Sequence, residues 1–154
     1  MPSASSKSAN KQKTPILSPM LNRDITAKEI MDREFLFFEP TMNLSKALEL
    51  LVDKGVSGGP VLDPKGKLLG FISERDLLRR IVEKPNLDLS LATVASYMRE
   101  QVFTVSGQTG LLELAEMFLN HWFHIFPVLE NETVLGIVSR RSVSKAMRSK
   151  IVSI

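Results

Sequence analysis

The sequence contains no cysteine, which excludes disulfide bonds, thiolate metal ligands and a cysteine nucleophile. No apolar run approaches the roughly 20 residues that a membrane-spanning helix needs. The first residues, MPSASSKSANKQK, lack the apolar segment of a secretory signal. An excess of one charge is also missing, because the formal net charge is only +3. We therefore expect a cytoplasmic protein with no membrane partner and no general attraction to nucleic acid.

Sequence patterns of common catalytic sites are absent as well. There is neither a Gly-x-Ser-x-Gly nucleophile elbow nor a Gly-x-x-x-x-Gly-Lys-Ser/Thr phosphate loop. His121 and His124 lie where a helix passes into a strand, so their rings need not share a face, and no third ligand completes a metal site. We predict that the chain is not an enzyme, binds no metal and requires no cofactor.

The stretch from Gly58 to Asp76 carries the clearest local pattern. Two apolar runs, Pro60–Leu62 and Leu68–Ile72, flank Asp63-Pro64-Lys65-Gly66, a sequence typical of a tight turn. The second run leads directly into Ser73-Glu74-Arg75-Asp76 and an apolar helical pattern that continues to about Val82. A β-hairpin followed at once by a helix is predicted.

Upstream of this stretch, residues 1–23 are polar and basic and predict a flexible tail. Thr26–Glu29 matches the capping box at the start of a short helix, in which a hydroxyl and a carboxylate bond to backbone N–H groups. Phe35–Phe38 predicts a brief strand. Apolar residues then recur at helical spacing from Leu44 to Val52, and Lys54-Gly55 predicts the end of this amphipathic helix.

The chain then repeats itself. When its second half is laid on the first in a constant register, Thr26 aligns with Thr93, Met31 with Met98 and Pro60–Leu62 with Pro127–Leu129. The next turn is one position shorter in the second copy, and beyond it Gly70 aligns with Gly136 and Ser73 with Ser139. We place the repeats at residues 24–84 and 92–150, with a linker at 85–91. A unit too small to bury its own core, present twice, predicts a packed pseudo-symmetric pair.

Each repeat resembles a CBS domain, the module named after cystathionine β-synthase, and the whole resembles a tandem CBS pair, or Bateman module. The resemblance rests on Thr-x-x-x-x-Met, on the strands PVLD and PVLE, and on Gly-h-h-Ser-x-x-Asp, complete at residues 70–76. It implies an α+β fold in which two βαββα repeats pack through their sheets. It further implies a homodimer, and clefts between the repeats that bind AMP, ADP, ATP or S-adenosylmethionine as a regulatory ligand.

In the first cleft, Asp76 is the main candidate for a ligand contact. Its carboxylate can accept hydrogen bonds from both vicinal hydroxyls of a ribose. Ser73 would serve ribose or phosphate, and Arg75, with Arg79 or Arg80, would meet a phosphate. The residues expected beside the base are Val56, Ser57, Gly58 and Pro60, joined by Thr104 because the resemblance places the early strand of the other repeat in this cleft.

The same residues admit a purely structural interpretation. Ser73 is then the N-cap of a helix, Asp76 a favourable acid in its first turn, and the arginines a solvated helix face. The local pattern alone does not separate this interpretation from a ligand site.

The second repeat departs from the pattern at one decisive position. Ser142 stands where the first repeat has Asp76, so the charged ribose acceptor is missing. Bulky Trp122–Phe126 replaces Gly55–Gly59 and can fill the space. We predict a weaker second cleft lined by Phe38, His124, Ser139, Arg140 and Ser142.

Two further segments each allow two interpretations. The aromatic cluster of Phe118, Trp122, Phe123 and Phe126 either completes a core or contributes to a dimer interface. The basic run at 140–150 either contacts nucleic acid or forms an amphipathic helix. Val143 and Met147 at i and i+4, with no alternating aromatics, favour the helix.

The sequence therefore predicts a stand-alone regulatory module that senses an adenine nucleotide or related adenosyl ligand. It would transmit binding to a partner protein whose identity the sequence does not reveal. The alternative is a module that has lost ligand binding and acts only by dimerising or docking.

Overall fold

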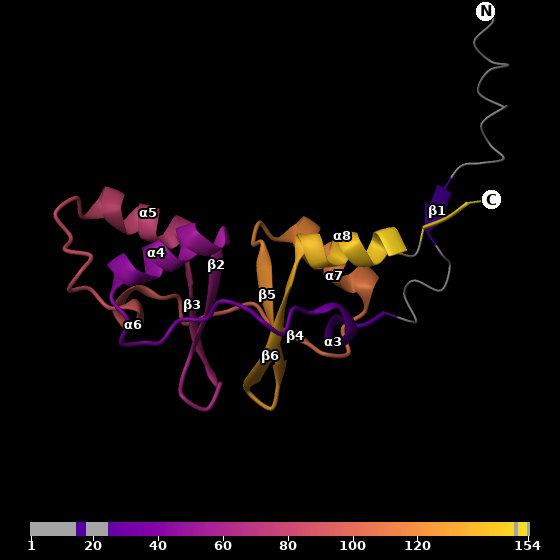
Figure 1. The fold of residues 1–154 in the computed structure, drawn as a ribbon, viewed down its shortest axis with the longest axis horizontal. Helices are drawn as coiled ribbons and strands as arrows, with labels where there is room; N and C mark the ends of the chain where they lie inside the picture. Colours follow the sequence, from indigo (N-terminus) through magenta and orange to yellow (C-terminus); the bar gives the residue numbers. More distant parts are fainter. Residues whose placement is uncertain (1–14, 18–24, 150, 154) are drawn as a thin grey trace, which may run out of the picture.

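The computed structural model describes residues 15–17, 25–149 and 151–153. Two halves lie side by side, each with two longer helices above a small sheet and a short helix lower on its flank (Figure 1). The first repeat supplies α3 (Ala27–Ile30), α4 (Leu44–Lys54), β2 (Gly58–Leu62), β3 (Leu68–Ser73) and α5 (Glu74–Glu83). The second supplies α6 (Val94–Tyr97), β4 (Val105–Ser106), α7 (Leu111–Asn120), β5 (Ile125–Glu130), β6 (Thr133–Ser139) and α8 (Arg140–Ser149).

The predicted amphipathic helix is confirmed as α4, and both of its ends have local causes. The Asn43 side chain accepts a hydrogen bond from the Lys46 N–H at 2.7 Å and caps the first turn. Gly55, with φ of 64°, ends the helix in the left-handed conformation that glycine adopts without a side-chain clash. The apolar stripe of Leu44, Ala47 and Leu51 is buried.

The predicted hairpin is confirmed as β2 and β3, which pair antiparallel. In the turn, Asp63 Oδ1 accepts hydrogen bonds from the N–H groups of Lys65 and Lys67 at 2.8 and 2.9 Å, and Gly66 adopts φ of 84°. Strand β2 begins at Gly58, earlier than predicted, because the pairing continues to Gly58 opposite Ser73.

Two details of the local predictions are wrong, namely the strand at Phe35–Phe38 and the side-chain bonds of the capping box, although the short helix is confirmed as α3 with Thr26 at its N-cap. Phe35–Phe38 is no strand; only Phe38 pairs, as an isolated parallel bridge to Val61. At α3 the Thr26 hydroxyl donates to the Glu29 carboxylate at 3.2 Å instead of capping the helix. The first N–H groups, of Ala27 and Lys28, instead donate to backbone carbonyls of the second repeat at 2.8 and 2.9 Å.

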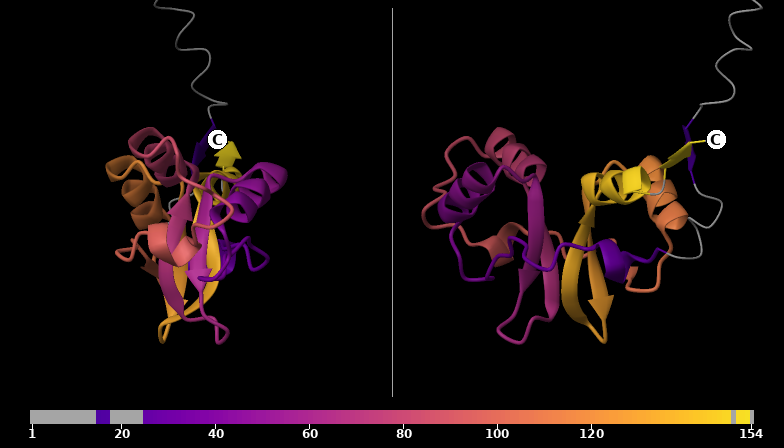
Figure 2. Two further views of the ribbon diagram at one scale, coloured as in Figure 1. Left: turned by 90° about the vertical axis from the view of Figure 1, so that its left-hand side faces the viewer. Right: turned by 45° about the vertical axis from the view of Figure 1, so that its right-hand side comes forward.

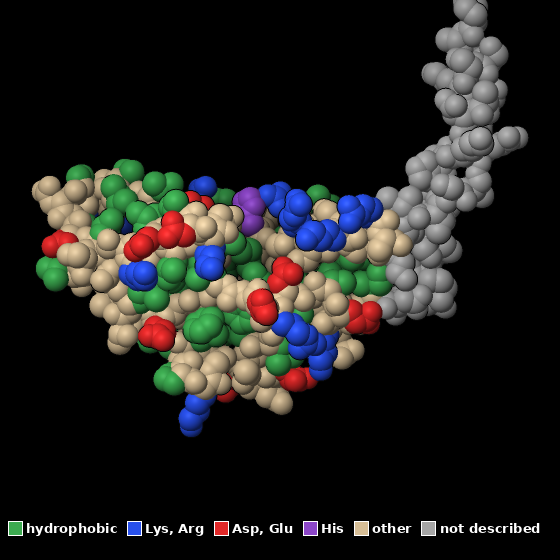
Figure 3. Space-filling model, viewed as in Figure 1, with side chains coloured by type: hydrophobic (Ala, Val, Ile, Leu, Met, Phe, Trp, Pro, Cys, Tyr) green, Lys and Arg blue, Asp and Glu red, His purple; other side chains and the backbone are tan. Residues whose placement is uncertain are grey.

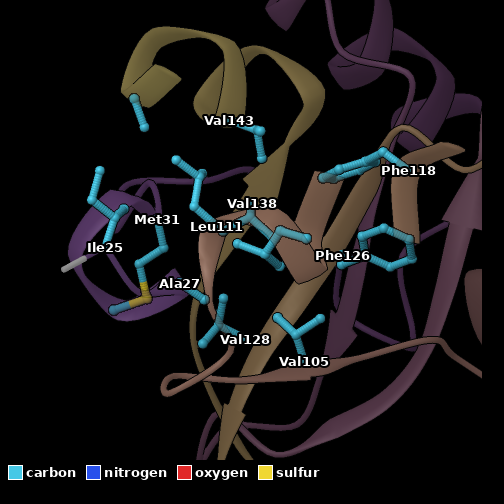
Figure 4. Packing of buried hydrophobic residues seen from close by; sticks show 12 residues of the cluster. Ile25, Ala27, Met31, Val105, Leu111, Phe118, Phe126, Val128, Val138 and Val143 are labelled. Carbon is cyan, nitrogen blue, oxygen red and sulfur yellow. The ribbon is translucent and has the colours of Figure 1, made fainter. Parts of the chain in front are cut away.

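The short helices are exchanged between the halves. One core cluster combines Ile25, Ala27 and Met31, around α3, with buried residues of the second repeat such as Phe126 and Val138 (Figure 4). The other core combines first-repeat residues with Val94, and Tyr97 and Met98 pack against it. Each repeat therefore depends on the other to complete its core.

A close backbone crossing fixes the position of the second residue after each short helix. Arg99 exchanges two backbone hydrogen bonds with Phe71 on β3, and Asp32 exchanges two with Ile137 on β6. The strands can approach because Gly70 and Gly136 lie there; a Cβ on either would come 2.6 Å from the backbone oxygen of Arg99 or Asp32. Residues 99 and 32 are thereby held near the ends of these strands.

The two halves meet through their sheets, with the hairpins β2–β3 and β5–β6 side by side (Figure 2). At the turns, Leu68 N–H donates to Glu132 O at 3.2 Å and Val134 N–H to Gly66 O at 3.1 Å. The predicted α+β pair of repeats packed through their sheets is confirmed.

The ends of the described chain meet in a separate ribbon, where β1 (Pro15–Leu17) pairs antiparallel with β7 (Ile151–Ser153). The remainder of the predicted tail, residues 1–14 and 18–23, lies outside the described residues. Within the described part of the chain, no helix has the length and apolar character to cross a membrane.

Candidate functional site

A cleft of about 470 Å³ lies between the start of α5 and the segment that follows α7. Because α5 belongs to the first repeat and α7 to the second, the cleft forms only when the repeats pack together. Its lining consists of Ser57, Ser73, Glu74, Arg75, Asp76, Leu78, Arg79, Arg99, Trp122, Phe123 and His124.

Ser73 and Asp76 form the predicted helix cap and also line this cleft. The Asp76 N–H donates to Ser73 Oγ at 3.2 Å, and the Ser73 hydroxyl donates to Asp76 Oδ2 at 2.8 Å. The structural interpretation of these residues as an N-cap is therefore confirmed. It does not compete with a binding role, because the cap itself holds the carboxylate at the cleft.

Arg99 is a cleft residue that sequence reasoning missed. Its Nε donates to Asp76 Oδ2 at 3.1 Å, and the Asp76 side chain retains only 12% of its exposure. Both side-chain hydrogen bonds that Asp76 receives from described residues end on Oδ2. Oδ1 receives no side-chain hydrogen bond from the described residues.

The opposite wall is aromatic. Trp122 remains 62% exposed, and the guanidinium carbon of Arg75 lies 3.7 Å from the centroid of its ring. Phe123 packs beside Trp122 and under the Arg99 guanidinium, with Arg99 Cζ 4.7 Å from the Phe123 ring centroid. The guanidinium groups of Arg75 and Arg99 therefore lie over the aromatic rings of Trp122 and Phe123.

The charges around the cleft favour an anionic ligand. Arg75, Arg79 and Arg99 outnumber Glu74 and Asp76 in the lining. A further cation, Arg140, lies nearby, because one of its guanidinium nitrogens is 2.7 Å from Nδ1 of the cleft residue His124. A carboxylate, a local excess of arginine and an aromatic wall together suit a ligand that combines hydroxyls, phosphate and a planar base.

The structure places some of the residues predicted beside a base in the lining of the cleft and others outside it. Ser57 lines the cleft. Val56 packs against the first core, and Gly58 and Pro60 are buried within β2. Thr104 is half-buried just before β4 and lies outside the lining of the cleft.

A second cleft of about 280 Å³ lies at the start of α8, lined by Ile30, Asp32, Ser139, Arg141, Ser142, Lys145 and Ala146. The buried Ser142 hydroxyl lies 3.0 Å from Ser139 Oγ and donates to Asp32 Oδ2 at 3.4 Å. In the register of the repeats, Asp32 is the counterpart of Arg99. The carboxylate missing at Ser142 is therefore present on the other wall, an acceptor that the sequence prediction overlooked.

Three residues predicted for the second cleft lie elsewhere. Phe38 is fully buried in the first core, where no ligand can reach it. His124 lines the first cleft, and Arg140 contacts His124 and lies outside the lining of the second cleft. The bulky Trp122–His124 segment forms a wall of the first cleft and does not occlude the second.

The repeat contained a signal for the missed residues. Arg99 and Asp32 directly follow the aligned Met98 and Met31, and their opposite charges marked a difference between the copies. Their placement beside α5 and α8 depends on the exchange of short helices, which the linear repeat does not reveal.

The structure also locates the aromatic cluster and the basic run, the two segments that allowed two interpretations. Phe118 and Phe126 belong to the core, whereas Trp122 lies at the surface. In α8, Val143 and Ala146 are buried, and Met147 packs against the same core, so the amphipathic helix is confirmed. Figure 3 shows Lys and Arg side chains gathered over α8.

A model of the CBS domain matches the chain twice, at residues 27–83 and 94–149. Among curated proteins, the A-adding tRNA nucleotidyltransferase of Aquifex aeolicus is 25% identical over 127 residues, which cover 82% of this chain but 15% of the enzyme. The chloroplastic CBS domain-containing protein CBSX1 of Arabidopsis thaliana is 26% identical over 177 residues, covering 95% of this chain and 73% of CBSX1. The chain spans only 15% and 42% of the first two curated relatives it matches.

Solved structures share the fold. The crystal structure of CBSX2, a CBS-pair protein of Arabidopsis thaliana, in complex with AMP superimposes with a TM-score of 0.71. The identity is 27%, and the match covers 80% of this chain and 96% of that one.

Proposed function

The chain belongs to the CBS-domain family as a tandem pair, and from that premise we propose that this regulatory module binds an adenine nucleotide in its first cleft. The observation that carries the proposal is the juxtaposition of Asp76 with three arginines and an aromatic wall in one cleft shared by both repeats. The AMP complex of CBSX2 supports AMP as the first ligand to test.

The geometry suggests a role for each group. Asp76 Oδ1 would accept hydrogen bonds from the ribose hydroxyls, while Arg99 and Ser73 hold the carboxylate in place through Oδ2. The phosphate would lie near the α5 start, within reach of Arg75 and Arg79. The base would lie between the backbone at Ser57 and the aromatic wall.

Binding in this cleft provides a route to regulation. A ligand that contacts α5 and the segment after α7 stabilises one relative position of the two repeats. We propose that a partner protein senses this change. A homodimer is supported by hydrophobic side chains that are exposed on α4 and α5, among them Val52 at 64% and Val82 at 79%.

Calorimetric titration and thermal unfolding with AMP, ADP, ATP and S-adenosylmethionine test the proposal. Ligand at a hundredfold over its Kd should stabilise the protein by about 2.7 kcal/mol. Asp76→Asn removes the charged acceptor and should weaken binding about tenfold or more, whereas the exposed Asp53→Asn on α4 should bind as the wild type does. Absence of binding by all four ligands, or equal affinity in Asp76→Asn, would contradict the proposal.

One observation favours a second candidate, an interaction module without a ligand. Asp76 already pairs with Arg99, and Arg75 already lies on Trp122, so three of the charged groups in the cleft have partners without a ligand. This candidate predicts a dimer in sedimentation experiments and no thermal shift with any of the four ligands. A shift with AMP that Asp76→Asn abolishes would exclude it.

A further inference from the structure

We propose that Trp122 is the base-stacking residue of the first cleft and that Arg75 covers its indole face until a base displaces it. The inference rests on the proposed function and specifies its contacts. It predicts that Arg75 opposes binding of the base and assists binding of the phosphate, so that the cleft distinguishes a nucleotide from its nucleoside.

The Arg75–Trp122 contact has the geometry of stacking. The guanidinium carbon lies 3.7 Å from the indole centroid, which is close to van der Waals contact between planar groups. Trp is the strongest aromatic partner of a cation, but the contact is weak where both groups remain hydrated. Because Trp122 keeps 62% of its exposure, a purine with its larger stacking area can replace the guanidinium.

The indole is also held at a fixed place relative to the ribose acceptor. Trp122 and Phe123 lie with ring centroids 6.2 Å apart and planes inclined by 19°. Phe123 in turn packs under Arg99, which donates to Asp76. A base on Trp122 and a ribose on Asp76 would thus occupy one cavity whose two walls are connected through side chains.

The second cleft offers no equivalent surface. The repeat aligns Trp122 with Gly55, and the described lining of the second cleft contains no aromatic side chain. Stacking of a base is therefore a property of the first cleft. This difference separates the two clefts independently of Asp76.

Displacement has a consequence for Arg75. It precedes Asp76 on α5 and lines the same cleft, so the freed guanidinium remains beside the ligand. A phosphate offers it a charge-assisted, bidentate partner in exchange for the lost aromatic face. A nucleoside offers no such partner, so its binding must overcome the Arg75–Trp122 contact without compensation.

The first test compares AMP with ribose 5-phosphate, which lacks the base, by calorimetry. Trp122→Leu should weaken AMP binding about tenfold and leave ribose 5-phosphate unchanged, and Trp122→Phe should retain most of the AMP affinity. Equal effects of Trp122→Leu on both ligands, or none on AMP, would overturn the inference. If the wild type binds none of AMP, ADP, ATP and S-adenosylmethionine, the proposed function itself fails and the stacking role fails with it.

The second test uses Arg75→Gln, for which opposite changes are expected with two ligands. Adenosine should bind more tightly than to the wild type, because the competing guanidinium is gone, whereas AMP should bind more weakly. Trp122 is the only tryptophan in the chain, so its fluorescence reports both the loss of Arg75 and the arrival of a base. If Arg75→Gln binds adenosine no more tightly than the wild type does, Arg75 does not compete with the base, and if AMP binding is not weakened, Arg75 does not assist the phosphate.

Discussion

At the scale of single residues, Asp76 serves as a helix-cap residue and as a cleft residue through different atoms. Its backbone N–H donates to Ser73 Oγ, its Oδ2 accepts from Ser73 and Arg99, and its Oδ1 is the oxygen that we propose for a ligand. The same contacts that stabilise the start of α5 therefore orient the carboxylate. Pre-orientation of this kind lowers the entropy cost of binding.

Arg99→Gln tests this division between stability and binding. The Arg99 side chain keeps 33% of its exposure but Asp76 only 12%, so Arg99→Gln takes a charged donor from a largely buried carboxylate and should lower the free energy of unfolding by about 1–3 kcal/mol. AMP affinity should fall severalfold, because Asp76 loses the partner that fixes Oδ2. Chemical denaturation and calorimetry on the same protein measure the two effects. A large loss of stability with unchanged affinity would assign Arg99 a structural role only.

Sequence reasoning could identify Ser57, Ser73, Arg75 and Asp76, because all four belong to the first repeat and flank one strand–helix junction. It could not place Arg99 or assign Trp122 to the same cleft. Arg99 is 23 positions from Asp76 and arrives through a strand crossing. Trp122 comes from the other repeat, and its dense aromatic surroundings suggested a core or an interface.

At the scale of elements, the exchange of α3 and α6 determines where the cleft residues lie. The crossings at Gly70 and Gly136 bring the backbone oxygens of Arg99 and Asp32 to within 2.6 Å of where a Cβ would stand. The glycines are therefore required by close approach of two backbones, and not by an unusual φ.

Gly70→Ala tests the importance of this crossing. The added methyl must displace the segment at Met98 and Arg99, which should cost about 1–3 kcal/mol of stability and weaken AMP binding through Asp76. Gly107→Ala is the matched control, because the nearest atom to its Cβ is the Lys28 Cβ at 3.2 Å, a contact that a shift of a few tenths of an ångström relieves. Thermal unfolding and calorimetry provide the measurements. Equal losses in the two variants would show that the crossing is not special.

Elements whose partners are close in sequence were predictable, and elements with distant partners were not. Helix α4 has its apolar stripe, its Asn43 cap and its Gly55 terminus in one continuous segment, and the β2–β3 hairpin closes on its own turn. At the predicted strand Phe35–Phe38, the backbone groups of Phe38 bond to Pro60 and Leu62 of β2, and at the predicted capping box the first N–H groups of α3 bond to the second repeat. The Ala27 and Lys28 N–H groups, for example, donate to Thr109 and Gly107.

At the scale of the whole molecule, the two clefts are related by pseudo-symmetry but carry their acids on opposite walls. The first has Asp76 on α5 and Arg99 on the crossing segment, while the second has Ser142 on α8 and Asp32 on the crossing segment. A duplicated scaffold thus presents two different charge arrangements. The first is an internal ion pair beside an aromatic wall, and the second is an exposed carboxylate beside Arg141 and Lys145.

Recreating the Asp76–Arg99 ion pair in the second cleft tests whether the two clefts are built on equivalent positions. Ser142→Asp alone places a largely buried carboxylate next to Asp32, whose Oδ2 lies 3.4 Å from the Ser142 hydroxyl, and should destabilise the protein by about 1–3 kcal/mol. Adding Asp32→Arg should recover most of this loss by recreating the Asp76–Arg99 pair. Chemical denaturation of the wild type, both single variants and the double variant gives the coupling energy.

The matched control adds Asp53→Arg to Ser142→Asp, which changes the net charge equally at a position on α4 outside the second cleft. Equal recovery by Asp53→Arg would mean that net charge, and not the local pair, is responsible. Calorimetry then separates the carboxylate from the aromatic wall. The double variant gains the ion pair but no counterpart of Trp122, so we expect its AMP stoichiometry to stay at one per chain. A second bound AMP would show that the carboxylate alone suffices, and that stacking is dispensable.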